Sequence, residues 1–150
     1  MLGLPVHPLL VHFAIVLLLL AAGAQLLVVV LPRFRRWLDW GIPLLAVVAA
    51  VVVRVTQSFG EILLQSVGSS QILEEHGAWG VRTGVAGIIL AVLSVLHWVA
   101  TSPWGRSRWA GRWPGWVGTA LGVLAAVAAV WAVVAVTLAG HTGATSVWGG

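Results

Sequence analysis

The chain has 150 residues and a formal net charge of +4, and 60% of its residues are hydrophobic while only 8% are charged. This composition excludes an ordinary soluble domain, whose water-exposed surface requires far more charge. The sequence contains no cysteine. Disulfides, thiolate metal sites, cysteine-ligated iron–sulfur clusters and covalent c-type haem attachment are therefore excluded as well.

Four apolar stretches are long enough to cross a bilayer, which takes about 20 mainly apolar residues per helix. Lipid offers no hydrogen-bond partners to the backbone, so each stretch is expected to be helical. The first stretch lacks the positive leader of a signal peptide, and we expect it to be retained as a helix. The sequence thus predicts one all-α domain, an integral membrane four-helix bundle, with helices at about 8–31, 41–60, 77–101 and 116–139.

The arginines predict the orientation of the bundle, because short loops rich in basic residues stay on the cytoplasmic side. Arg33, Arg35 and Arg36 lie in the loop 32–40, and three more arginines lie in the loop 102–115. We therefore expect both loops to be cytoplasmic and both termini to lie outside. The net positive charge reflects this topology and does not indicate nucleic-acid binding.

Small residues recur at helical spacing in the third and fourth stretches. Gly80 and Gly84 are four residues apart, as are Gly118 and Gly122, and alanines continue the second series. Small side chains let helices approach closely in lipid. We expect these positions to face neighbouring helices.

Histidines are the most informative polar residues in this chain. His12 lies about one turn into the first helix, His76 lies at the start of the third, and His141 follows the fourth directly after Gly140. These three are expected in the outer layer of the membrane. His97 lies about 20 residues into the third helix, roughly 30 Å deeper by helical rise, so we assign it to the cytoplasmic edge. We interpret His97 and His7 as structural.

Other polar groups are predicted at the same outer level. Arg54, Gln57 and Glu61 recur near one and two turns in the second helix, and Arg82 lies in the third. A charge within a membrane span is costly and normally faces a partner. We therefore expect Arg54 to point inward, into an outer cavity lined also by the three histidines and Glu61.

Motifs at both ends of the chain resemble a known family. The opening His7-Pro8-Leu9-Leu10-Val11-His12-Phe13 is similar to the HPxxVHF start of the bacterial membrane proteins called domain of unknown function 2231. The resemblance continues through Gly60-Glu61, Glu75-His76-Gly77 and Gly140-His141-Thr142-Gly143-Ala144, with Trp148 near the end. Ala14 departs from the family pattern, which usually has proline there. The resemblance implies a four-helix protein of the bacterial inner membrane and no established activity.

The histidines and arginines favour a b-type haem. His12 paired with His76 or His141 would supply axial ligands, and Arg54 and Arg82 would balance the haem propionates. Such a protein would carry electrons between quinone and an outer partner, either alone or as a subunit of a larger respiratory complex. The same region offers an alternative zinc or copper site, with His12, His76, His141 and Glu61 as ligands.

Two further classes of function stay open, and neither needs a cofactor. Small-residue helix faces and the near absence of extramembrane mass fit a structural or assembly subunit that docks other membrane subunits. Charges within the spans fit a proton or metal channel, although the polar groups concentrate in the outer half. No nucleophile elbow or phosphate-binding loop occurs in the sequence, so we do not expect the chain to be an enzyme by itself.

Overall fold

The computed structural model describes residues 6–67 and 71–148, with side chains for residues 10–31, 33–62 and 74–144. The described part is all helical, which confirms the predicted fold class. Its elements are α1 (Val6–Val30), α2 (Pro32–Leu38), α3 (Gly41–Val67), α4 (Gln71–Thr101), α5 (Pro103–Gly105), the π-helical turn η1 (Arg106–Ala110) and α6 (Gly115–Trp148).

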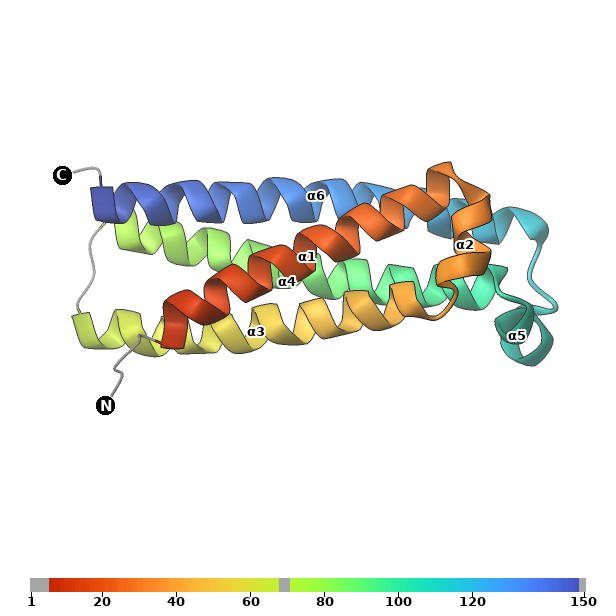
Figure 1. Ribbon diagram of the computed structural model, residues 1–150, viewed down its shortest axis with the longest axis horizontal. Helices are drawn as coiled ribbons and strands as arrows, with labels where there is room; N and C mark the ends of the chain where they lie inside the picture. Colours follow the sequence, from red (N-terminus) through yellow and green to blue (C-terminus); the bar gives the residue numbers. More distant parts are fainter. Residues whose placement is uncertain (1–5, 68–70, 149–150) are drawn as a thin grey trace.

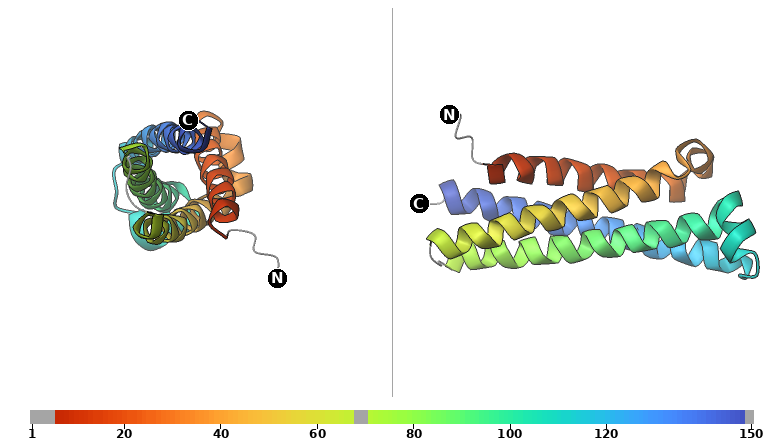
Figure 2. Two further views of the ribbon diagram at one scale, coloured as in Figure 1. Left: turned by 90° about the vertical axis from the view of Figure 1, so that its left-hand side faces the viewer. Right: turned by 90° about the horizontal axis from the view of Figure 1, so that it is seen from below.

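The four long helices form an antiparallel bundle (Figure 1). In the view along the bundle, α1, α3, α4 and α6 occupy the corners of a square in which α1 adjoins α3 and α6, and α4 adjoins the same two helices (Figure 2). The beginning of α1, the end of α3, the beginning of α4 and the end of α6 lie at one end, which we call the terminal end. The other end holds α2, α5 and η1, and we call it the arginine-rich end.

Four helices in the described part are long and apolar enough to cross a membrane, as the sequence predicts. Their membrane-crossing portions are 10–30, 41–62, 74–101 and 115–144. Three helices continue beyond the predicted ends, because intrahelical hydrogen bonds satisfy the backbone in the headgroup layer as well as in hydrocarbon. The fourth predicted helix corresponds to α6. It was expected to end before Gly140, but α6 continues to Trp148, so this expectation is wrong.

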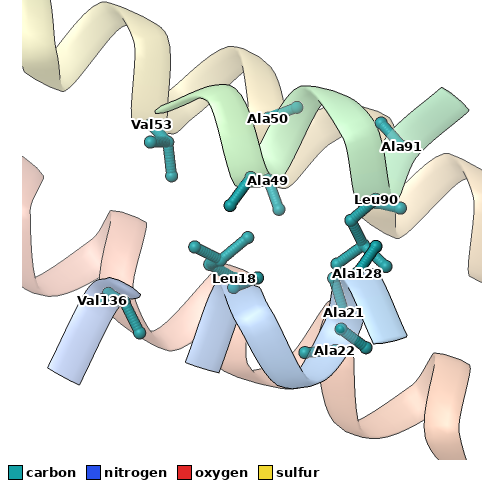
Figure 3. Packing of buried hydrophobic residues seen from close by; sticks show 14 of the residues in the cluster. Leu18, Ala21, Ala22, Ala49, Ala50, Val53, Leu90, Ala91, Ala128 and Val136 are labelled. Carbon is teal, nitrogen blue, oxygen red and sulfur yellow. The ribbon is translucent and has the colours of Figure 1, made fainter. Parts of the chain in front are cut away.

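The core of the bundle is built mainly from alanines surrounding a few larger side chains. Leu18 and Leu90 are the largest apolar side chains with less than 2% of their surface exposed. In Figure 3, Leu18 of α1 points toward Ala49 of α3, and Leu90 of α4 lies against Ala128 of α6. Alanine lets the helix axes come close, and the two leucines fill the remaining central space.

The predicted small-residue faces lie between helices, with one exception. A side chain at Gly84 would meet Gln57 and Arg54 of α3, and one at Gly122 would meet His97 of α4. These positions confirm the packing prediction. Gly80 has no atom within 4 Å of the place where its Cβ would be, so the prediction that it packs against a neighbour is wrong.

Candidate functional site

His76 is held in a fixed orientation at the terminal end. Its Nδ1 lies 3.0 Å from the carbonyl oxygen of Ala139 and 3.4 Å from Oγ1 of Thr142, both on α6. A carbonyl only accepts, so Nδ1–H donates in the shorter contact, and in the neutral ring Nε2 then carries the lone pair. A metal-ligating histidine usually donates its second ring N–H to a carboxylate, a backbone carbonyl or a water, and the Ala139 carbonyl is a partner of this kind.

The absence of a side chain at Gly143 makes room for this imidazole. A Cβ at that position would lie 2.9 Å from Cε1 and 3.2 Å from Nδ1 of His76. Close approach of the α6 backbone therefore restricts the ring in addition to its hydrogen bond. This glycine belongs to the motif Gly140–Ala144, which lies in α6 and contacts His76.

The other outer histidines lie at different positions relative to His76. His141 precedes Thr142 on α6, so it shares the level of His76, and its side chain is exposed. Gln25 of α1 contacts His97 of α4, and Leu18 of α1 lies beside Gly87 of α4. Counting back along both helices from these two contacts places His12 level with residues 81–84 of α4. His12, which is also exposed, thus lies roughly 10 Å farther along the bundle than His76, at 1.5 Å per residue. The side chain of His7 lies outside the described residues.

Arg54 is exposed on the surface of the bundle, so the expectation that it points into the interior is wrong. Its guanidinium donates to Oε1 of Gln57, and Nε2 of Gln57 donates to Oε1 of Glu61 at 2.8 Å. The result is a hydrogen-bonded row along α3, which we call the α3 polar row. The aliphatic part of the Arg54 side chain lies over Gly84 of α4. The neighbouring core, which includes Ala49, Ala50 and Val53, is apolar and offers no partner for a buried charge, which explains the outward position.

Arg82 is exposed on α4, with its guanidinium carbon 4.4 Å from the centre of the Trp79 ring. This stacking gives the charge a cation–π partner on its own helix. Arg82 and the α3 polar row therefore belong to the outer surface, and they do not line a central cavity.

The described side chains contain no group of three or more His, Cys, Asp or Glu placed to hold a metal ion. The zinc or copper set of His12, His76, His141 and Glu61 is not assembled in this part of the chain. The haem and metal assignments both stay predictions.

A second polar cluster, which the sequence reasoning missed, lies at the arginine-rich end. Nε2 of Gln25 on α1 lies 3.0 Å from Nδ1 of His97 on α4, and these side chains are 1% and 6% exposed. The bond joins two diagonally opposed helices. A Cβ at Gly122 would lie 3.2 Å from His97 Nε2, so α6 covers the other edge of the ring.

The connecting segments brace this cluster. Nε1 of Trp98 donates to Oδ1 of Asp39 at 2.8 Å, and the Trp98 ring stacks on Trp104 of α5 with centroids 5.4 Å apart. A cavity of about 10 Å³ lies beside Gln25 and Ser94, whose Oε1 and Oγ atoms are buried and have no hydrogen-bond partner in the described structure. A single water molecule fits a cavity of this size.

One signal in the sequence marks this cluster. Gln25 lies deep in the first helix, whose remaining residues beyond His12 are apolar, and His97 is an isolated histidine near the end of the third. Polar side chains buried in membrane helices normally form hydrogen bonds with one another. Pairing them requires the helix register, which the sequence alone does not provide.

The fold and these intramembrane polar groups define a small polytopic α-helical membrane protein. The chain belongs to the family described as predicted membrane protein, DUF2231, whose model matches residues 3–150. This match confirms the resemblance seen in the end motifs. Neither the curated proteins nor the solved structures contain a match to the chain.

Proposed function

We propose that this protein binds a b-type haem at its terminal end, with His76 as an axial ligand, and transfers electrons within a bacterial inner membrane. The observation that carries the proposal is the 3.0 Å contact between His76 Nδ1 and the Ala139 carbonyl, which leaves the Nε2 lone pair for iron. In this proposal the arginine-rich end is cytoplasmic, in line with the positive-inside rule.

The helix register bears on the second axial ligand. Two axial histidines approach one iron from opposite faces and therefore need the same level in the bundle. His141 satisfies this condition with respect to His76, whereas His12 lies roughly 10 Å away along the axis. In place of His12 paired with His76 or His141, we therefore propose His76 paired with His141, or with a residue of another subunit. Quinone is the proposed electron donor.

The direct test is a set of absorption spectra of detergent-purified protein after haem-replete expression, oxidised and then dithionite-reduced. We expect a Soret band that shifts on reduction, is lost in His76→Ala, and is retained in the matched variant His12→Ala. No Soret band in the unaltered protein contradicts haem binding. Stoichiometric zinc or copper in that same sample supports the alternative metal site.

A glycine pair tests the position of the imidazole without removing it. Gly143→Ala places a methyl group 2.9 Å from His76 Cε1, whereas Gly140→Ala meets no atom within 4 Å. We expect the first variant to lose haem or shift its Soret band, and the second to match the unaltered protein. Equal spectra for both variants would argue against His76 as a ligand.

The α3 polar row favours a second candidate function, that of a structural or assembly subunit. Arg54 and Glu61 are exposed on a membrane-spanning helix of the single chain, where lipid is a poor solvent for them. A neighbouring subunit would provide polar partners. Purification from native membranes in mild detergent tests this proposal, and a particle with the mass of one chain would contradict it.

A further inference from the structure

A pocket of about 360 Å³ opens between α1 and α6 at the arginine-rich end. Arg35 of α2 and Arg106 of η1 both line it, although they come from different connections of the chain. Val29 of α1 and Val123 of α6 provide apolar walls, and Val123 is 54% exposed. The pocket therefore has basic side chains at the arginine-rich end of the bundle and apolar side chains on the surface that faces lipid.

The charge around this pocket strongly favours an anion. Six arginines and one aspartate lie in the segment 31–40 and the segment 102–115, which gives a local charge of 6 − 1 = +5. The aspartate, Asp39, already accepts a hydrogen bond from Trp98. Two guanidinium groups on separate segments can hold one phosphate from two sides, and each does so with paired donors.

Polar groups continue into the bundle behind the arginines. His97 and Thr101 line the pocket and also line the small cavity next to Gln25. That cavity shares Arg35 with the pocket, and the buried oxygens of Gln25 and Ser94 beside it lack partners in the described structure. A hydrogen-bonding occupant, rather than a hydrocarbon chain, therefore suits the inner wall.

We propose that this pocket binds the phosphate of an anionic phospholipid. The phosphate lies between Arg35 and Arg106, and an acyl chain leaves along Val29 and Val123 toward the bilayer. The apolar walls belong to the membrane-crossing portions of α1 and α6, which places the phosphate at the depth of a lipid headgroup. This site is separate from His76 and does not depend on haem binding.

The test is native mass spectrometry of the purified full chain, titrated with phosphatidylglycerol and, separately, with phosphatidylcholine. We expect one preferentially bound phosphatidylglycerol. Arg35→Gln and Arg106→Gln should each weaken its binding about tenfold, as the loss of a charge-assisted hydrogen bond implies. The matched controls are Arg36→Gln and Arg108→Gln, which change the same charge on exposed residues outside the pocket lining and should change affinity less than about twofold.

A blocking variant makes the test independent of the arginines. Thr119 is an exposed residue of α6 in the pocket wall, so Thr119→Trp should fill the pocket and weaken phosphatidylglycerol binding while leaving the fold intact. Equal binding of the two lipids overturns the proposal, as do equal losses in pocket and control arginine variants. Displacement of the lipid by inorganic phosphate at comparable concentration would assign the site to a soluble anion and overturn the lipid assignment.

Discussion

Replacing Leu18 with alanine tests what holds this bundle together. Leu18 is 1% exposed at the centre of an alanine-rich core, and its Cδ1 would lie 3.7 Å from a Cβ at Gly87. In soluble proteins a buried Leu→Ala change costs about 2.7–5.0 kcal/mol. Roughly 2.4 kcal/mol of that is transfer from water, at about 0.8 kcal/mol for each of three carbons.

The transfer free energy from water should not contribute in a membrane, because Leu18 stays in hydrocarbon when the helices separate. The cavity part remains, since neighbouring alanines are too short to fill the space, and we expect a loss of about 0.3–2.6 kcal/mol in the free energy of unfolding. Leu20 is the matched control, because it lies on the same helix and is 56% exposed. Leu20→Ala should change stability by less than about 0.5 kcal/mol.

The assay is unfolding of the purified protein by sodium dodecyl sulfate in mixed micelles, followed by circular dichroism. Equal losses for Leu18→Ala and Leu20→Ala would refute the reasoning, because lipid-facing and core leucines would then contribute alike. A loss near 5 kcal/mol for Leu18→Ala alone would show that the transfer term survives in lipid.

Two further substitutions follow from the same structure and use the same assay. Gln25→Leu leaves His97 buried without its partner, so we expect a loss of about 1–3 kcal/mol. The double variant with His97→Leu should lose less than the sum of the single variants, and additive losses would show that the two side chains are not coupled. Gly105→Ala places a methyl group against the Val99 backbone and should cost about 1–3 kcal/mol, whereas Gly115→Ala, with open space at its Cβ, should be neutral. Equal stability of the two glycine variants would contradict the close approach of α5 to α4.

The membrane-spanning architecture was predictable because it depends on composition and helix length alone. Apolar runs of about 20 residues identify membrane spans whatever the register between neighbouring helices. Glycine spacing likewise predicted the contacts at Gly84 and Gly122, because close packing leaves few alternatives to small residues. These properties are local, so one sequence is enough to find them.

The polar sites were less predictable because they depend on rotation and register between helices. The sequence indicates that His76 and Arg54 both lie toward one end of the bundle, but it does not indicate that one contacts α6 and the other faces outward. The Gln25–His97 bond crosses the bundle between residues 72 positions apart. The sequence indicates a structural role for His97 but does not identify Gln25 as its partner, since no local pattern connects the two positions.

The diagonal bond between Gln25 and His97 also constrains the order in which the bundle assembles during synthesis. Translation proceeds from the N-terminus, so α1 enters the membrane long before α4 has been made. Until His97 arrives, the Gln25 amide lacks its native partner in a helix surrounded by lipid, a state that favours contact with water or insertion machinery. Closure of this bond requires α3 and α4 to be in place. The contact between α1 and α4 is therefore a late event of folding, although α1 is synthesised before α3, α4 and α6.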